Sequence, residues 1–224
     1  MKKIILFLIF SSALNINAQQ PGIGVTDLNG KKYKTIIIED VDWMIENLNV
    51  SQFRNGDIIP EAKTAQQWMN AGNKGNPAWC YYDFDSKNES KYGKLYNWFA
   101  VNDSRGLAPE GWEIPSFFYW FNLPKECGGI KVEELPQLFY AKEFTNIFHS
   151  QKGGYISEDG LFLDRNKADY YLMSQNDGEQ WFASFEEEST KDDLFNNPNV
   201  AFYNINNYFY TGPKAGASVR CIKE

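Results

Sequence analysis

An oxygen-rich stretch, DFDSKNE at residues 83–89, is the first place in this chain where side chains able to bind a ligand gather. Calcium requires several carboxylate and amide oxygens on a flexible loop, and the stretch supplies them at Asp83, Asp85, Asn88 and Glu89. The glycine and the closing glutamate of an EF-hand are absent. Asp and Asn also cap backbone groups in ordinary turns. We therefore interpret the stretch first as a solvated turn, with Ca²⁺ as the alternative.

A run of adjacent aromatic residues, Phe117, Phe118 and Tyr119, is a candidate ligand-binding surface. Apolar ring faces stack on sugar rings, while nearby amides and carboxylates bind the hydroxyl groups. Successive residues of a helix point in different directions, so a helix cannot bury all three on one face. An exposed platform and a local repacking of the core remain equally open interpretations.

Residues 196–210, NNPNVAFYNINNYFY, combine tyrosine with asparagine. Tyrosine gives rigid contact area and asparagine gives adaptable hydrogen bonds, which is a common chemistry of recognition. The candidate binding residues in this stretch are Tyr203, Asn204, Asn206, Asn207 and Tyr208. The same alternation also fits an ordinary half-exposed strand, and we favour the strand slightly.

Catalytic chemistry has little support in the sequence. His149 is the single histidine and no motif surrounds it, so a zinc site would lack its usual ligands. Carboxylate pairs could serve glycoside hydrolysis, but 29 acidic residues guarantee such pairs by chance. The run Glu186-Glu187-Glu188 is more typical of a solvated face. We predict no catalytic residues and no enzyme.

The N-terminus has the features of a cleaved signal peptide over residues 1–18. Lys2 and Lys3 precede a short apolar run, Ile4–Phe10, which is too short to span a bilayer, and Ala18 fits a cleavage site. We expect residues 19–24 to be a flexible tail and residues 25–224 to form one domain. No later segment is long and apolar enough for a membrane span.

The net charge points away from nucleic acid as a partner. It is −7 for the full chain and becomes −9 once Lys2 and Lys3 are removed. An acidic surface repels phosphate backbones.

Turn and capping residues predict the secondary structure in the first half of the chain, which must position these candidate site residues. Asn29-Gly30 predicts a β-hairpin with a type I′ turn, and Glu39-Asp40 offers a second turn. Thr64 is a good N-cap for a helix over residues 65–70.

The later elements follow from periodicity. Apolar residues at i, i+3, i+4 and i+7 predict a buried helix over residues 92–101. Ser116 is a good N-cap for another helix, which we expect Pro124 and Gly128-Gly129 to end early. From Gly153 onward, short apolar runs between turn residues predict β-structure. The whole pattern favours a single α+β domain.

Several short segments, taken together and in order, resemble those of a known family. They are Tyr33-Lys34-Thr35, WMIENL at 43–48, WCYYD at 79–83, YGKLYNW at 92–98, GLAPEGW at 106–112, IPS at 114–116 and SVRC at 218–221. The chain is similar in these segments to the Fibrobacter succinogenes major paralogous domain (FISUMP) family. The resemblance implies a C-type-lectin-like fold, related to that of the formylglycine-generating enzyme family. In such folds the first and last strands pair, helices pack on the sheet, and long loops carry ligand sites.

The resemblance also implies a place and a role. The family occurs in exported bacterial proteins, so we expect the protein in the periplasm, at the cell surface or secreted in a Gram-negative bacterium. It lends no catalytic residues, and the reactive cysteine pair of the formylglycine-generating enzyme is not matched. Cys80 and Cys221 lie at matched family positions, so we expect a disulfide between them. Phe117 to Tyr119 depart from the family, which usually has an acidic or small pair there.

These observations lead to three hypotheses. The first is an exported, non-enzymatic adhesion module that binds a glycan or a surface protein through aromatic and Asn-rich loops. The second is an enzyme that acts on extracellular carbohydrate or protein. The third is a structural subunit of a surface assembly.

Overall fold

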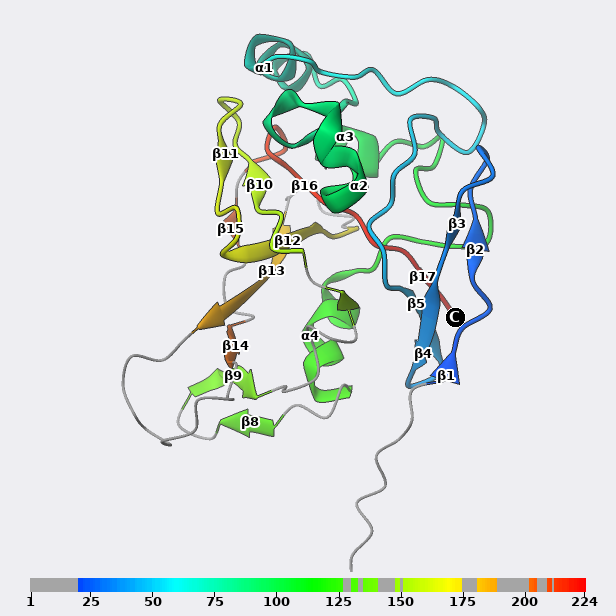
Figure 1. Ribbon diagram of the computed structural model, residues 1–224, viewed down its shortest axis with the longest axis vertical. Coiled ribbons are helices and arrows are strands. Elements are labelled where there is room, and N and C mark those ends of the chain that lie inside the picture. The colour runs from blue at the N-terminus through cyan, green and yellow to red at the C-terminus, as the bar shows by residue number, and fades with distance from the viewer. Residues whose placement is uncertain are drawn as a thin grey trace, which may run out of the picture.

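Strands from the two ends of the chain share one four-stranded sheet in the computed structural model (Figure 1). The structure describes residues 20–126, 130–132, 135–140, 148–149, 151–174, 181–188, 202–204, 209–210 and 212–224. The order in the sheet is β1 (Gln20–Pro21), β4 (Thr35–Ile38), β5 (Val41–Met44) and β17 (Ile222–Lys223), all antiparallel. The first and last strands of the domain therefore meet through β4 and β5.

Residues 20–24 of the expected tail at 19–24 are hydrogen-bonded to the first sheet, and residue 19 lies outside the described residues. Gln20 and Pro21 pair with β4, and the Gly22 amide donates to the Thr35 carbonyl at 2.9 Å. The Ile23 amide donates to Asp42 Oδ2 at 3.0 Å. A Cβ on Gly22 would lie 1.9 Å from Asp42 Oδ1, so only glycine permits this close approach.

The expected hairpin forms between β2 (Val25–Thr26) and β3 (Lys32–Tyr33), but with a different turn. Asp27 Oδ1 accepts hydrogen bonds from the amides of Asn29 and Lys31, and only Gly30 takes a positive φ, of 81°. The turn with positive φ at both central residues, as type I′ requires, lies instead at Glu39 and Asp40, between β4 and β5.

A second, five-stranded sheet occupies the middle of the domain. Its order is β11 (Phe162–Leu163), β10 (Tyr155–Ile156), β16 (Gly216–Ala217), β7 (Leu95–Asn97) and β6 (Trp79–Cys80). The helices around it are α1 (Ala65–Asn73), η1 (Tyr82–Phe84), η2 (Ser86–Asn88), α2 (Glu89–Tyr92) and α3 (Trp98–Val101). Thr64 caps α1 as predicted, and its hydroxyl accepts from the Gln67 amide. The helix continues three residues beyond the predicted end.

The predicted helix over residues 92–101 is wrong, because β7 interrupts it. Gly93 has a φ of 72° and ends α2. Asn97 then ends the strand and starts α3, since its Oδ1 accepts from the Ala100 amide at 3.0 Å and from the Ala78 amide at 3.0 Å. One side chain thus caps a helix and fixes the neighbouring segment, which apolar periodicity does not reveal.

A third sheet forms the lower left of Figure 1. Its order is β12 (Ala168–Leu172), β13 (Trp181–Glu188), β14 (Phe202–Asn204), β9 (Leu135–Tyr140) and β8 (Ile130–Val132), and β15 (Phe209–Tyr210) also pairs with β13. The described part of the chain is thus one small α+β domain of mixed sheets and few helices, as predicted. Within that part, no helix has the length and apolarity to cross a membrane.

Helix α4 (Phe117–Glu126) joins the first and third sheets (Figure 1). Trp120 is fully buried, stacks on Tyr171 of β12 at 4.9 Å between ring centroids, and meets Trp43 of β5 edge to face at 5.2 Å. The helix passes Pro124 and ends at Glu126, while Gly128 and Gly129, which were expected to end it together with Pro124, lie outside the described residues. Aromatic packing across the helix therefore holds two sheets together.

Candidate functional site

A buried arginine ties together three segments that lie far apart in the sequence. Arg220 is 1% exposed, and its Nε donates to Asn47 Oδ1 at 2.8 Å. One terminal nitrogen donates to the Met44 carbonyl at 3.1 Å, and the other donates to the Phe148 carbonyl at 2.9 Å and the Tyr171 hydroxyl at 3.3 Å. All of these acceptors are neutral oxygens, and no described carboxylate forms an ion pair with Arg220.

Asn47, whose Oδ1 accepts from Arg220, extends this network through its side-chain nitrogen. Its Nδ2 donates to the Tyr92 carbonyl at 3.0 Å and to Ser218 Oγ at 3.1 Å. Residues 43–48, 92–98 and 218–221, which carry the family resemblance, are therefore joined by one amide side chain. Their first role is architectural.

Lys94 has a similar buried position beside this network. It is 4% exposed, and its Nζ donates to the carbonyl of Asn49 at 3.0 Å and to Asn49 Oδ1 at 2.7 Å. It also lies 4.6 Å from the centroid of the Trp79 ring. Burial lowers the pKa of Lys94, while Glu89, at 3.5 Å, opposes that shift.

The oxygen-rich stretch at 83–89 folds into η1, η2 and the start of α2, where protein groups engage each of its four candidate ligands. Asp83 Oδ2 accepts from Arg165 at 2.7 Å, and Asp85 Oδ1 accepts from the Lys87 amide at 3.0 Å. Asn88 Nδ2 donates to the Tyr82 carbonyl, and Glu89 Oε1 accepts from Asn49 Nδ2. The hydrogen bond from Asn49 and the neighbouring Lys94 lower the pKa of Glu89. These contacts are those of a turn. No group of three or more His, Cys, Asp or Glu in the described residues could hold a metal.

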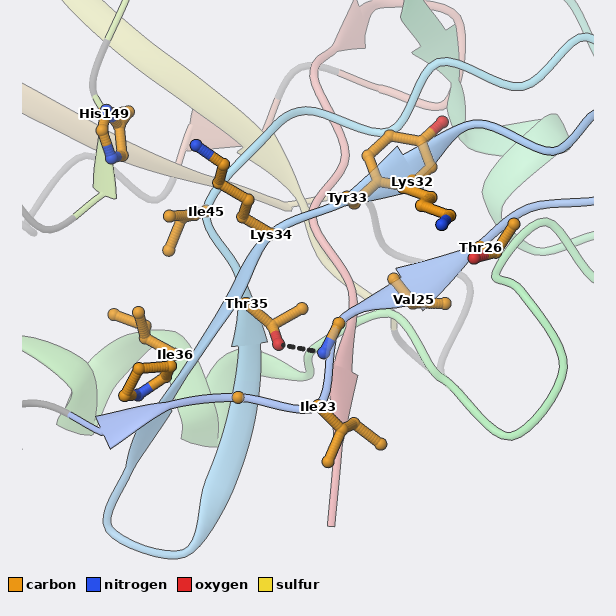
Figure 2. A pocket seen from close by; sticks show the side chains of 13 residues that line it. Ile23, Val25, Thr26, Lys32, Tyr33, Lys34, Thr35, Ile36, Ile45 and His149 are labelled. Carbon is orange, nitrogen blue, oxygen red and sulfur yellow. Dashed lines mark hydrogen bonds between the residues drawn. The ribbon is translucent and has the colours of Figure 1, made fainter.

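A hollow lies elsewhere, between β3–β4 and the N-terminal strap, defined as residues 20–26. This groove has a volume of about 720 Å³ and is shown in Figure 2. Isoleucine and valine side chains supply its apolar surface, and Lys32, Lys34 and the threonines supply its polar groups. The Gly24 amide donates to Thr35 Oγ1 at 2.9 Å, which holds the strap across the strands. Backbone pairing thus fixes both walls of the groove.

A second, smaller pocket of about 240 Å³ adjoins the groove. Lys34, Ile45 and His149 line both hollows and lie together at one end of the view in Figure 2. The further lining residues are Lys31, Glu46, Asn47, Glu89, Ser90, Lys91, Tyr92, Gly93, Gln151 and Arg220. The buried network around Asn47 and Arg220 therefore forms part of the pocket wall.

The aromatic run on α4 is partly exposed, as helix geometry requires. Phe118 is 68% exposed and Phe117 is 40% exposed. Tyr119 is half-buried, meets the Trp43 ring edge to face, and donates its hydroxyl proton to Glu224. The platform interpretation therefore applies to Phe117 and Phe118, while Tyr119 also packs against the core.

The other predicted site residues fall partly outside the described chain. Tyr203 and Asn204 lie in β14, in keeping with the strand interpretation, whereas Asn206, Asn207 and Tyr208 lie outside the described residues.

The expected disulfide between Cys80 and Cys221 is not formed in this structure. Both are free, buried thiols, and burial raises the pKa of each. They pack in different core clusters, Cys80 with Trp68 and Cys221 with Tyr96.

The groove and the pocket were missed by reasoning from the sequence. Some of the lining residues belong to the segments that carry the family resemblance. Tyr33, Lys34 and Thr35 line the groove, and Asn47 and Arg220 line the pocket. Isolated lysines and an asparagine carry no motif of their own. The pairing of β4 with β5 places Lys34 beside Ile45 and Glu46, and the pairing of β17 with β5 brings Arg220 to Asn47.

Comparison with known families gives one clear match. The model of the Fibrobacter succinogenes major domain matches residues 36–223, which is most of the chain. Neither a curated protein nor a solved structure matches at a significant level.

Proposed function

Because the chain belongs to the Fibrobacter succinogenes major domain family, we propose that it is an exported, non-enzymatic binding module that recognises a glycan or a surface protein. The observation that carries this proposal is the groove under the N-terminal strap, with the adjoining pocket at its end. Binding sites are concave, with apolar walls and a few well-placed polar groups. The signal-peptide features of residues 1–18 support export.

The groove suits a ligand with both apolar faces and hydroxyl groups. Ile23, Val25 and Ile36 provide aliphatic surface, and Lys32 and Lys34 provide donors. A sugar ring or an extended peptide offers the matching groups. Because both walls belong to paired strands, a ligand would meet a largely pre-formed surface.

The proposal includes a variant of the C-type-lectin-like fold. Its support is the meeting of the early strands β1, β4 and β5 with the last strand β17 in one sheet. The packing of α4 against β5 and β12 through Trp120 is a second point of support.

A structural subunit of a surface assembly is the second candidate function. The exposed rings of Phe117 and Phe118 on α4 favour it. Such a role requires a stable oligomer that covers these rings.

The groove can be tested with a charge at its mouth. Ile23 is 72% exposed and lines the groove, so Ile23→Glu should weaken binding to the ligands found by glycan array and by pull-down of surface extracts, with and without calcium, by about tenfold or more. Leu161→Glu is the matched control, because Leu161 is 60% exposed and lies in the β10–β11 turn. If Ile23→Glu binds the ligands as tightly as Leu161→Glu does, the groove is not the binding site. Absence of any ligand for the wild-type protein would remove the binding function.

A further inference from the structure

The pocket beside the groove concentrates positive charge on an acidic protein. Four cationic side chains line it, Lys31, Lys34, Lys91 and Arg220, against the two carboxylates of Glu46 and Glu89. The chain as a whole has a net charge of −7. A local excess of positive charge in a concave site attracts anions there, even where the rest of the surface repels them.

In the described part of the chain, the two carboxylates of this pocket interact with groups other than its cationic side chains. Glu89 interacts with Lys94 at 3.5 Å and accepts from Asn49, and Glu46 accepts from the Lys34 backbone amide at 3.2 Å. Lys31 and Lys91 lie over the rings of Tyr33 and Tyr92, at 4.6 and 4.7 Å from the centroids. Among the described residues, no carboxylate forms an ion pair with Lys34, Lys91 or Arg220.

Arg220 is the second, independent observation. It is 99% buried, lines the pocket, lies over the rings of Phe148 and Tyr171, and among the described residues donates hydrogen bonds only to neutral oxygens. A buried guanidinium without a counter-ion is costly, and an anion in the adjoining space reduces that cost. Asn47, Gln151 and Ser90 in the same wall can bind hydroxyl groups beside the anion.

We propose that the pocket formed by Lys34, Lys91 and Arg220 binds the anionic group of an acidic glycan, a carboxylate or a sulfate ester, while the adjoining groove holds the neighbouring sugars. This inference rests on the proposed binding function and narrows it to a ligand class. Lys34 lies in the walls of both hollows and therefore contacts the charged sugar at the point where the chain enters the groove.

The test compares one neutral oligosaccharide with two acidic ones. Trigalacturonate and its methyl ester have the same sugar skeleton, and a sulfated galactan oligosaccharide supplies the other anion. Calorimetric titration of the wild-type chain should show one of the acidic ligands binding at least tenfold more tightly than the neutral ester, and the affinity should fall as salt is added. The preferred acid identifies the source of the anionic group.

Variants locate the binding. Lys34→Ala and Lys91→Ala should each weaken acidic-ligand binding about three- to tenfold, and the double variant more. Lys63→Ala is the matched control, because its side chain is 67% exposed, pairs with Glu61 and lines neither hollow. Arg220 is left intact because its loss would disturb the fold, and near-ultraviolet circular dichroism checks the lysine variants.

Each outcome decides between the two proposals. If neither acidic ligand binds more tightly than the neutral ester, the acidic-ligand inference is overturned and the binding function still stands. Binding of protein ligands alone has the same consequence. Unchanged affinity in both lysine variants also overturns the inference, since the anion would then bind elsewhere. Absence of binding to any glycan or surface extract overturns both.

Discussion

Arg220 shows at the scale of single residues how this chain keeps a charge in its interior. Four neutral oxygens surround the guanidinium, and Asn47 supplies one of them while donating to Tyr92 and Ser218. Hydrogen bonds to charged groups are stronger than those between neutral groups. Removal of one partner leaves a buried charge poorly solvated, which costs more than the bond itself contributes.

We therefore expect Asn47→Ala to lower the free energy of unfolding by about 2–4 kcal/mol. Urea unfolding followed by tryptophan fluorescence measures the change. Asn55→Ala is the control, because Asn55 is exposed and bonds only within its own turn to Asp57, so its effect should stay within about 0.5 kcal/mol. A similar loss in both variants would argue against a central role for Asn47.

At the scale of elements, α4 is the connection between two sheets. Trp120 is buried between Trp43 of β5 and Tyr171 of β12, whereas Phe118 on the same helix is 68% exposed. Opposite faces of one helix thus hold a core residue and an exposed ring. The exposed ring contributes little to stability and remains available to a partner.

Trp120→Ala should lower the free energy of unfolding by about 3–5 kcal/mol, because it leaves a large cavity between the sheets. Phe118→Ala should change it by about 0.5 kcal/mol or less. Both values come from denaturant curves on purified protein. If the Phe118 variant alone also changes the sedimentation behaviour from oligomer to monomer, the structural-subunit candidate gains support. A Trp120 variant as stable as wild type would show that α4 does not hold the sheets together.

The secondary-structure elements with clear capping, turn or strand patterns in the sequence were predicted correctly. The Thr64 cap, the hairpin around Gly30 and the strand-rich second half are all present. The prediction failed at residues 92–101, where apolar residues recur with helical spacing although Gly93 and Asn97 break the helix around a central strand. A buried strand is apolar on both faces, so its periodicity does not distinguish it from a buried helix.

The groove and the pocket could not be predicted for a related reason. Their walls come from the N-terminal strap, β3–β4, the start of α2 and the end of the chain, and none of these carries a motif for ligand chemistry. In the sequence, Lys34 looks like an ordinary surface residue. It lines a groove because the N-terminal strap lies next to it, and the close approach of Gly22 to Asp42 holds the strap there. Residues that long-range strand pairing brings into one site can be identified only from the structure.

At the scale of the whole molecule, buried hydroxyl and thiol groups govern the response to alkali. Burial raises the pKa of Tyr33, Tyr96 and Tyr171 and of both Cys80 and Cys221. In the unfolded chain such groups ionise near their ordinary values, 9.0 for cysteine and 10.0 for tyrosine. The unfolded state then binds fewer protons than the folded state, so stability falls as pH rises.

We expect the urea midpoint to fall steadily from about pH 8 to about pH 11, with tyrosinate absorbance rising in step with unfolding. Lys94, whose pKa burial lowers, acts with the opposite sign but is a single group. On the acid side, hydrogen bonds lower the pKa of Glu89 and Asp103, so their contribution is lost as pH falls through those lowered values. A midpoint that stays constant up to pH 11 would contradict this account.

Because β17 pairs with β5, the first sheet can form only after β17 has been synthesised. Ile222 and Lys223 lie opposite Trp43 and Asp42, so the first sheet lacks a strand until about 180 further residues have followed β5 in synthesis. Until then β5 presents an unpaired edge, which is a hazard for aggregation. Pairing across so much of the chain is also slow. The native first sheet therefore cannot be completed before residues 222–223 have been synthesised and can reach β5.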